Sequence, residues 1–197
     1  MIKRIFLMLA SVSFSLIFSQ ETKPSKPVMG FYINPTVNLG YNLANRIKDN
    51  QNKDSQDYQQ NVSPYLPNDF TYGITAVAGY NFIPNLALGS GLKYSFIADN
   101  FHLLYWVFQP KIMFNSGDEP IFVDLNYGKQ INRSAVSDSQ FYGLKLGIQI
   151  SYLKRLSQEG GIILESHKFA NSSAVFVGLS YGVTIFSNKN YTGYGED

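Results

Sequence analysis

The chain has 197 residues, of which 15% are charged and 15% aromatic, with 16 glycines, no cysteine and a formal charge of +2 at pH 7. Globular domains average about 25% charged residues. The many aromatic residues exclude a disordered chain, the lack of cysteine excludes a disulfide scaffold and a thiolate metal or redox site, and the small net charge argues against a nucleic-acid partner.

The first 19 residues have the pattern of a secretory signal. Lys3 and Arg4 precede an apolar run at 5–18, and Ser19 is a small residue at which cleavage is expected. The alternative, a membrane-anchoring helix, needs about 17–25 apolar residues, whereas this run has 14. We therefore predict a signal peptide at 1–19 and a formally neutral mature chain, because both basic residues leave with the signal.

The sequence that follows alternates between apolar and small or polar residues with the period of a β-strand. The clearest segment is 141–153, where Leu144 and Leu146 share one face and Lys145 lies on the other. The segment 101–114 alternates in this way only in its second half. The predicted strands are 31–41, 72–82, 86–96, 101–114, 121–127, 141–153, 160–169 and 175–185.

Short and long connections alternate along the chain. Turn signals lie at 84–85, 116–118 and 157–159, after the second, fourth and sixth predicted strands. Polar connections at 44–69 and 133–139 lie at the opposite end of the sheet. This order predicts an all-β fold, an eight-stranded antiparallel up-and-down barrel.

Alternation alone does not say which face of the barrel meets water. A soluble secreted barrel that holds an apolar ligand turns its apolar face inward, whereas a membrane barrel turns that face toward lipid. The polar face here is poor in charge and rich in glycine, as a narrow lumen requires. Aromatic residues ten apart also bound several apolar faces, and ten tilted strand residues span about 25 Å of membrane. We therefore predict a transmembrane barrel, with an aromatic girdle made of Phe31, Tyr41, Tyr72, Phe82, Tyr142 and Tyr152.

The stretch 71–94, TYGITAVAGYNFIPNLALGSGLKY, joins two amphipathic strands by a tight turn. In this stretch the chain resembles the small, porin-like outer-membrane β-barrel proteins of Gram-negative bacteria. The resemblance implies a periplasmic segment at 20–28, an outer-membrane barrel at 29–186 and a tail at 187–197, with the long loops at the cell surface. It also implies outer-membrane lipid and the barrel-insertion machinery as partners. The chain departs from the pattern of this family at Phe186, the aromatic residue nearest the end of the last predicted strand. By the alternation of that strand, Phe186 falls on the face that points into the lumen.

The polar strand faces carry several charged side chains into the predicted lumen. By parity these are Lys93, Lys111, Asp124, Lys145, Glu165 and His167. Charges removed from water must be paired, so we predict a network of ion pairs that closes the middle of the barrel. The alternative is a polar conduit for water or small solutes, although an eight-stranded interior has room for little beyond its own side chains.

We predict no catalytic, metal or cofactor site. Ser166 and His167 are adjacent, but neighbours on a strand point to opposite faces, which argues against an envelope hydrolase. Asp49, Asp54 and Asp57 lack the spacing of a calcium loop. The leading hypothesis is a non-enzymatic protein with an envelope structural role or a surface ligand for its loops. A narrow channel for small solutes and a soluble barrel with an apolar ligand are the alternatives.

Overall fold

A computed structural model describes eight stretches of the chain, which are residues 30–43, 68–83, 85–98, 101–114, 121–134, 138–153, 155–169 and 173–187. The predicted signal peptide, nearly all of the 44–69 loop and the predicted tail beyond residue 187 lie outside them. The strands are β1 (Gly30–Asn42), β2 (Phe70–Ile83), β3 (Leu86–Ala98), β4 (Phe101–Phe114), β5 (Ile121–Gln130), β6 (Gln140–Leu153), β7 (Leu156–Lys168) and β8 (Ser173–Phe186). Among the described residues, no helix is long and apolar enough to cross a membrane.

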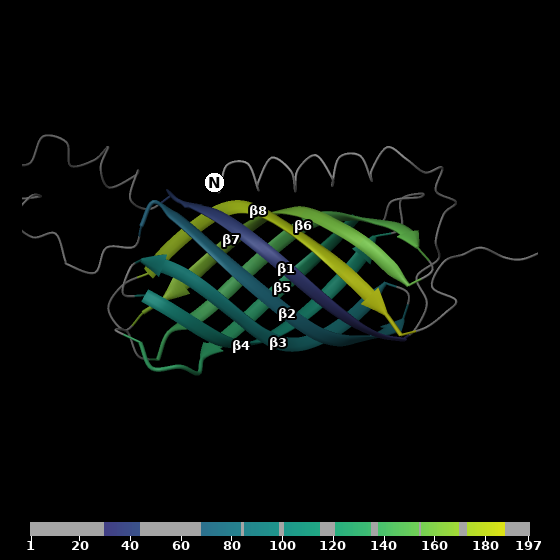
Figure 1. The fold of residues 1–197 in the computed structure, drawn as a ribbon, viewed down its shortest axis with the longest axis horizontal. Helices are drawn as coiled ribbons and strands as arrows, with labels where there is room; N and C mark the ends of the chain where they lie inside the picture. Colours follow the sequence, from purple (N-terminus) through teal and green to yellow (C-terminus); the bar gives the residue numbers. More distant parts are fainter. Residues whose placement is uncertain are drawn as a thin grey trace, which may run out of the picture.

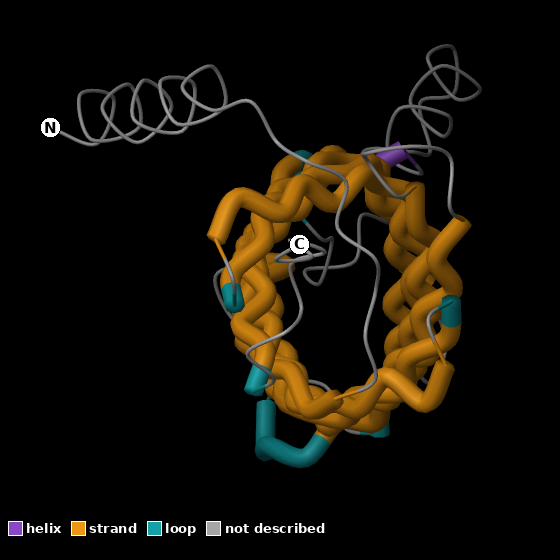
Figure 2. The backbone as a smooth tube through the Cα atoms, turned by 90° about the vertical axis from the view of Figure 1, so that its right-hand side faces the viewer, coloured by secondary structure: helices purple, strands orange, loops and turns teal. Residues whose placement is uncertain are grey.

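The eight strands form one closed antiparallel barrel (Figures 1 and 2). Each strand pairs with its neighbours in the chain, and β8 pairs with β1 to close the ring. The β2–β3, β4–β5 and β6–β7 connections lie at one end, which we call the turn end, and the remaining connections lie at the other, the loop end. The predicted eight-stranded up-and-down barrel is thus confirmed.

The strand boundaries differ most from the prediction at β7. Leu153 pairs with Leu156 across the hairpin, so residues 157–159 are strand residues and the turn predicted there is wrong. A polar triplet is typical of a turn in a soluble protein. Here Ser157 and Glu159 point into the polar lumen, where polar strand residues are ordinary, and Gln158 lies on the opposite face of the strand. The strand β5 also runs three residues beyond its predicted end, to Gln130.

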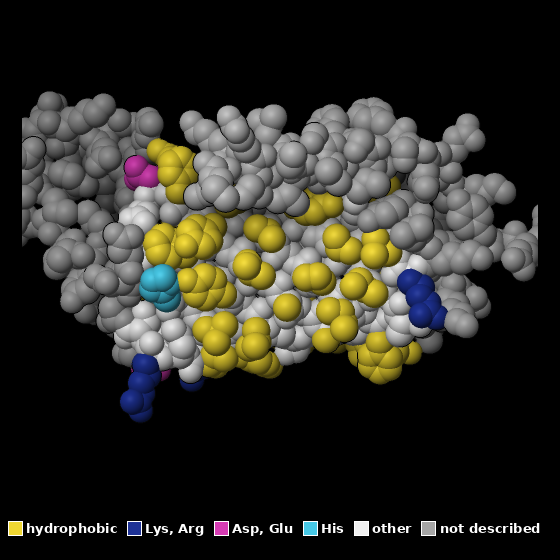
Figure 3. Space-filling model, viewed as in Figure 1, with side chains coloured by type: hydrophobic (Ala, Val, Ile, Leu, Met, Phe, Trp, Pro, Cys, Tyr) yellow, Lys and Arg dark blue, Asp and Glu magenta, His cyan; other side chains and the backbone are white. Residues whose placement is uncertain are grey.

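The barrel is apolar outside and polar inside. On the outer wall, Leu179 and Ile162 are 67% and 60% exposed, whereas Lys93 and Glu159 on the inner wall are each 1% exposed. Figure 3 shows one side of this wall, with hydrophobic side chains over the middle and charged side chains toward the ends. A water-soluble barrel has the opposite distribution, so this is the surface of a transmembrane barrel.

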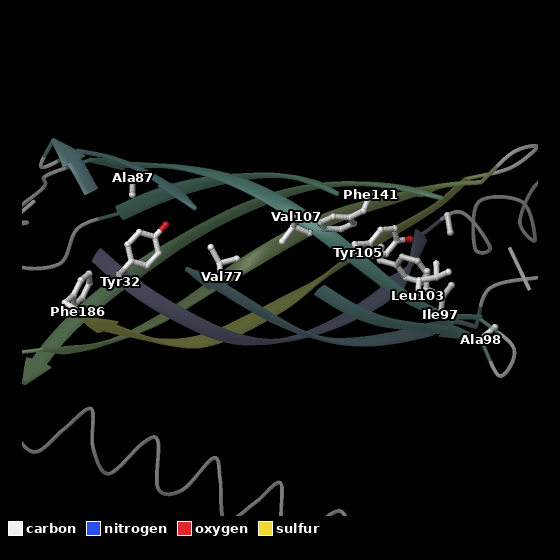
Figure 4. Packing of buried hydrophobic residues seen from close by; sticks show 12 residues of the cluster. Tyr32, Val77, Ala87, Ile97, Ala98, Leu103, Tyr105, Val107, Phe141 and Phe186 are labelled. Atoms are coloured by element: carbon white, nitrogen blue, oxygen red, sulfur yellow. The ribbon is translucent and has the colours of Figure 1, made fainter. Parts of the chain in front are cut away.

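Apolar side chains fill both ends of the lumen (Figure 4). Tyr32 and Phe186 lie near the turn end, with ring centroids 6.4 Å apart. Leu103 and Tyr105 of β4 lie near the loop end and are fully buried. Apart from His102 at the loop end, the first half of β4 is therefore apolar on both faces, because one face meets the apolar surroundings and the other fills the lumen.

Two prolines interrupt the ladders between strands. No ladder pair joins Asn34 and Pro35 to β8, and none joins Gln109 and Pro110 to β5. Proline has no N–H group to donate, so it is confined to the edges and breaks of sheets. In each case the amide side chain before the proline connects the two strands from inside the barrel. Asn34 donates to a backbone carbonyl of β8 at 3.4 Å, and Gln109 donates to the Asn126 side chain of β5 at 3.0 Å.

Candidate functional site: the charged lumen

The lumen residues toward the loop end centre on Glu165 of β7. Lys93 of β3 donates to Glu165 Oε1 at 2.7 Å, and Asn38 of β1 donates to the same oxygen at 3.2 Å. His167 Nε2 lies 3.7 Å from the other carboxylate oxygen, Oε2. Because β3 and β7 stand on opposite sides of the eight-stranded ring, the Lys93–Glu165 ion pair crosses the lumen. We call these four residues the loop-side cluster.

Hydrogen bonds continue from this cluster toward the loop end. The Tyr105 hydroxyl lies 2.9 Å from His167 Nδ1 and 2.8 Å from Ser139 Oγ. The rings of Phe141 and Phe176 pack against the imidazole at centroid distances of 5.2 and 5.7 Å. All of these side chains are buried, so packed side chains occupy this section of the lumen.

The lumen residues toward the turn end centre on Glu159 of β7. Lys111 Nζ lies 2.6 Å from Glu159 Oε2, and Lys145 Nζ lies 2.5 Å from Oε1. The Thr184 hydroxyl also donates to Oε2, at 3.3 Å. These donors replace the water that a carboxylate loses on burial, a loss that is costly when nothing compensates it.

We call Glu159, Lys111 and Lys145, together with Asp124 and Phe122 of β5, the turn-side cluster. Asp124 lies opposite Lys111 on one neighbouring strand and opposite Lys145 on the other. It accepts a hydrogen bond from Gln109 at 3.4 Å. The ammonium groups of Lys111 and Lys145 lie 3.9 and 5.1 Å from the centre of the Phe122 ring, within the range of cation–π attraction.

The structure places all six predicted lumen residues inside the barrel, but in two groups. Lys93, Glu165 and His167 belong to the loop-side cluster, and Lys111, Asp124 and Lys145 belong to the turn-side cluster. Sequence reasoning missed Glu159, the residue that joins two of the lysines. Its parity with Glu165 was the available signal, and the mistaken turn at 157–159 hid it. With Glu159 included, three buried lysines face three buried carboxylates, so the described lumen is formally neutral when His167 is neutral.

Little space remains between the two clusters. A cavity of about 20 Å³ lies there, lined among others by Lys93, Gln109, Lys145 and Glu165. A cavity of this size holds one water molecule. The described lumen is therefore a packed polar core with no wide passage along it.

Glycines of the lumen wall make room for Tyr32 at the turn end. A Cβ atom on Gly79 would fall onto the Tyr32 ring, and one on Gly89 would lie 2.8 Å from its hydroxyl oxygen. We expect Gly79→Ala to displace the ring and to lower the free energy of unfolding by about 1–3 kcal/mol, as overpacking does. Urea unfolding of the barrel in lipid vesicles measures this loss.

The matched control for this substitution is Gly160→Ala. Among the described residues, a Cβ atom on Gly160 would meet no atom closer than 4.0 Å, so we expect a change within about 0.5 kcal/mol. Equal effects of the two substitutions would contradict the packing described for Tyr32.

The predicted girdle residues that the structure describes lie on the outer wall. Four are exposed by 46–67%, namely Phe31, Tyr72, Phe82 and Tyr142. Tyr41 is half-buried, and the Tyr152 side chain lies outside the described part of the chain. Tyr72 stacks on Phe96 with ring centroids 4.7 Å apart. Contact of these rings with a membrane interface stays a prediction.

Ser166 and His167 point to opposite sides of the barrel wall. His167 is buried in the lumen, whereas Ser166 is a half-buried residue of the outer wall. Within the described stretches, no three His, Cys, Asp or Glu side chains are grouped so that they could hold a metal ion. Asp49, Asp54 and Asp57 lie outside these stretches.

No protein-family model and no curated protein matches the chain. Among solved structures, the chain is similar to Neisserial surface protein A (NspA), with a TM-score of 0.51 and 14% identity over 79% of this chain and 96% of that chain. A structure from the de novo design of transmembrane β-barrels is also similar, with a TM-score of 0.44 and 17% identity over 85% of this chain and 99% of that chain. The N-terminal β-barrel domain of Pseudomonas aeruginosa OprF gives a TM-score of 0.43 and 10% identity over 80% and 100% of the two chains. The closed ring of strands, its apolar outer wall and the likeness to NspA lead to one conclusion: the chain has the fold of the small eight-stranded outer-membrane β-barrels.

Proposed function

We propose that this chain is an integral outer-membrane barrel without enzymatic activity, and that its lumen is closed. Its role would be structural in the envelope, or interaction at the cell surface through the loops at 44–69 and 133–139. The observation that carries this proposal is the combination of an apolar outer wall with a lumen blocked by two ion-paired clusters.

Burial and charge support the closed lumen. Both clusters cross the interior, and apolar rings fill the barrel beyond them at both ends. A solute on its way through the barrel would have to separate Lys93 from Glu165 and then Lys111 and Lys145 from Glu159. Breaking such buried pairs is costly, because each leaves an uncompensated charge.

The same proposal assigns the partners of the chain. Outer-membrane lipid would cover the apolar wall, and the barrel-insertion machinery would assemble it. Export would depend on the signal at 1–19, which is supported by the Lys3-Arg4 start and the apolar run after it. No nucleic acid or cofactor is part of this function.

Membrane integration can be tested by fractionation and gel migration. We expect the protein to sediment with the outer membrane and to migrate differently in detergent gels before and after heating, because a closed barrel resists detergent until heat unfolds it. Recovery of the protein as a soluble periplasmic species would contradict the proposal and favour the soluble barrel.

The closed lumen can be tested by conductance in planar bilayers. Once the heat shift verifies folding, we expect no steady single-channel steps, because the packed clusters leave space for about one water molecule between them. Reproducible steps from folded protein would overturn the closed lumen and favour a channel for small solutes.

A further inference from the structure

The outer wall carries an apolar groove of about 550 Å³ over strands β4 to β8. Three leucines that pair across adjacent strands, Leu125, Leu144 and Leu164, form a row along it. A second row of pairs, nearer the loop end, consists of Phe108, Tyr127, Tyr142, Ser166 and Val175. The volume is that of a site for a small molecule, and its lining is almost entirely apolar.

One further step toward the loop end, the same strands present a row of a different kind. Lys129 pairs with Gln140, and Gln140 pairs with Lys168. Both lysines are exposed, and neither forms an ion pair with any described residue. The two lysines stand two strand spacings apart, about 10 Å between Cα atoms, so that their side chains can converge on one anion.

Gln140, between the two lysines, can present its amide NH₂ group as a hydrogen-bond donor. The Tyr142 hydroxyl donates to Gln140 Oε1 at 2.9 Å, which occupies the carbonyl side of the amide and leaves its NH₂ group available. Asp138 is the exposed acidic residue closest in sequence to this row, and the same connection also carries the basic residue Arg133. The row therefore offers two cations and one amide donor immediately above an apolar groove.

From this arrangement we infer that the outer wall binds a lipid with a phosphate headgroup. The phosphate lies between Lys129 and Lys168 and accepts from Gln140, and an acyl chain lies in the groove below. The charge of the headgroup complements the two lysines, which act on phosphate as point charges at the membrane interface. This inference rests on the proposed membrane placement of the barrel.

The single tryptophan of the chain is a reporter at this site. Trp106 pairs with Lys129 and is 47% exposed on the outer wall. The barrel is reconstituted in phosphatidylcholine vesicles that contain increasing fractions of brominated phosphatidic acid or, in parallel, brominated phosphatidylcholine. We expect half-maximal quenching of Trp106 at an about tenfold lower mole fraction of the phosphatidic acid, because two interfacial lysines attract an anionic headgroup more strongly than a zwitterionic one.

Variants separate the headgroup from the groove. The double variant Lys129→Gln/Lys168→Gln should bring the two lipids within about twofold of each other, whereas Arg155→Gln, at an exposed basic residue of the turn end, should leave the preference intact. Ser166→Phe should fill the groove and reduce the preference. Its control is Ser90→Phe, at a half-buried serine of the adjoining groove on the outer wall, which shares Phe108 with this one.

The outcomes distinguish this inference from the proposed function. A tenfold preference that survives the double lysine variant, or that Arg155→Gln abolishes equally, overturns the lipid site while the barrel remains in the membrane. Absence of quenching by either brominated lipid, in protein that has folded, means that Trp106 does not face the bilayer and overturns the membrane placement itself.

Discussion

Glu159→Gln should lower the free energy of unfolding of the barrel by about 3–5 kcal/mol, the loss expected when one partner of a buried ion pair is removed. Glu159 is 1% exposed and accepts from both Lys111 and Lys145. Glutamine keeps the shape of the side chain but not its charge, so two ammonium groups would be left without the carboxylate that joins them. Urea unfolding in lipid vesicles, followed by the fluorescence of Trp106, measures the loss.

Asp124 is expected to reduce the loss of stability in Glu159→Gln, and this can be tested with a double variant. It lies opposite both lysines, and its Oδ1 atom has no hydrogen-bond partner among the described residues. It can therefore take over part of the role of Glu159. We expect the double variant Asp124→Asn/Glu159→Gln to lose more stability than the two single variants together, as neighbouring groups of one network do.

The control is Ser95→Ala, because the Ser95 hydroxyl is buried in the lumen and has no hydrogen-bond partner in the part of the chain that the structure describes. Removing an unpaired buried hydroxyl should change the stability little. If Glu159→Gln costs no more than Ser95→Ala, the ion pairs of the turn-side cluster do not stabilise the barrel.

The alternation in the sequence was sufficient to predict the barrel, because a strand has only two faces. In 141–153, the positions of Leu146 and Lys145 fix which face is apolar, and the structure has the same strand within one residue. The same reasoning failed at 157–159, where a polar triplet is compatible with a turn and also with a strand whose first and third residues line a polar lumen. Only the pairing of Leu153 with Leu156 decides between them.

Parity could predict which charged residues enter the lumen, but not which of them pair. Lys93 and Glu165 are 72 positions apart and meet across the lumen. Their meeting depends on the tilt and stagger of all eight strands, since shear sets the heights of residues on opposite walls. These are properties of the closed barrel that no single strand contains. This is why one network was predicted and the structure shows two clusters.

The second large effect on stability is expected for a charge on the outer wall, because the apolar face of the barrel points outward. Leu146 lies in the middle of β6 on the outer wall and is 51% exposed. In water, replacing an exposed leucine usually changes stability by less than about 0.5 kcal/mol. In a bilayer, Leu146→Arg should cost about 2–4 kcal/mol, because an arginine at the midplane of a barrel has to be removed from water. Urea unfolding in vesicles gives the value.

The depth dependence makes this prediction specific for a membrane. Ile131, just beyond the end of β5 at the loop end, is 55% exposed, which is close to the exposure of Leu146. Near the interface an arginine costs only about 0–1 kcal/mol, so Ile131→Arg should be nearly neutral although Ile131 and Leu146 are similarly exposed. A soluble barrel would treat the two substitutions alike, because equal exposure to water gives equal hydration. Equal losses for Leu146→Arg and Ile131→Arg would thus contradict the transmembrane orientation, whereas a large loss at mid-height with a small one at the end is the result expected if the middle of the wall faces lipid.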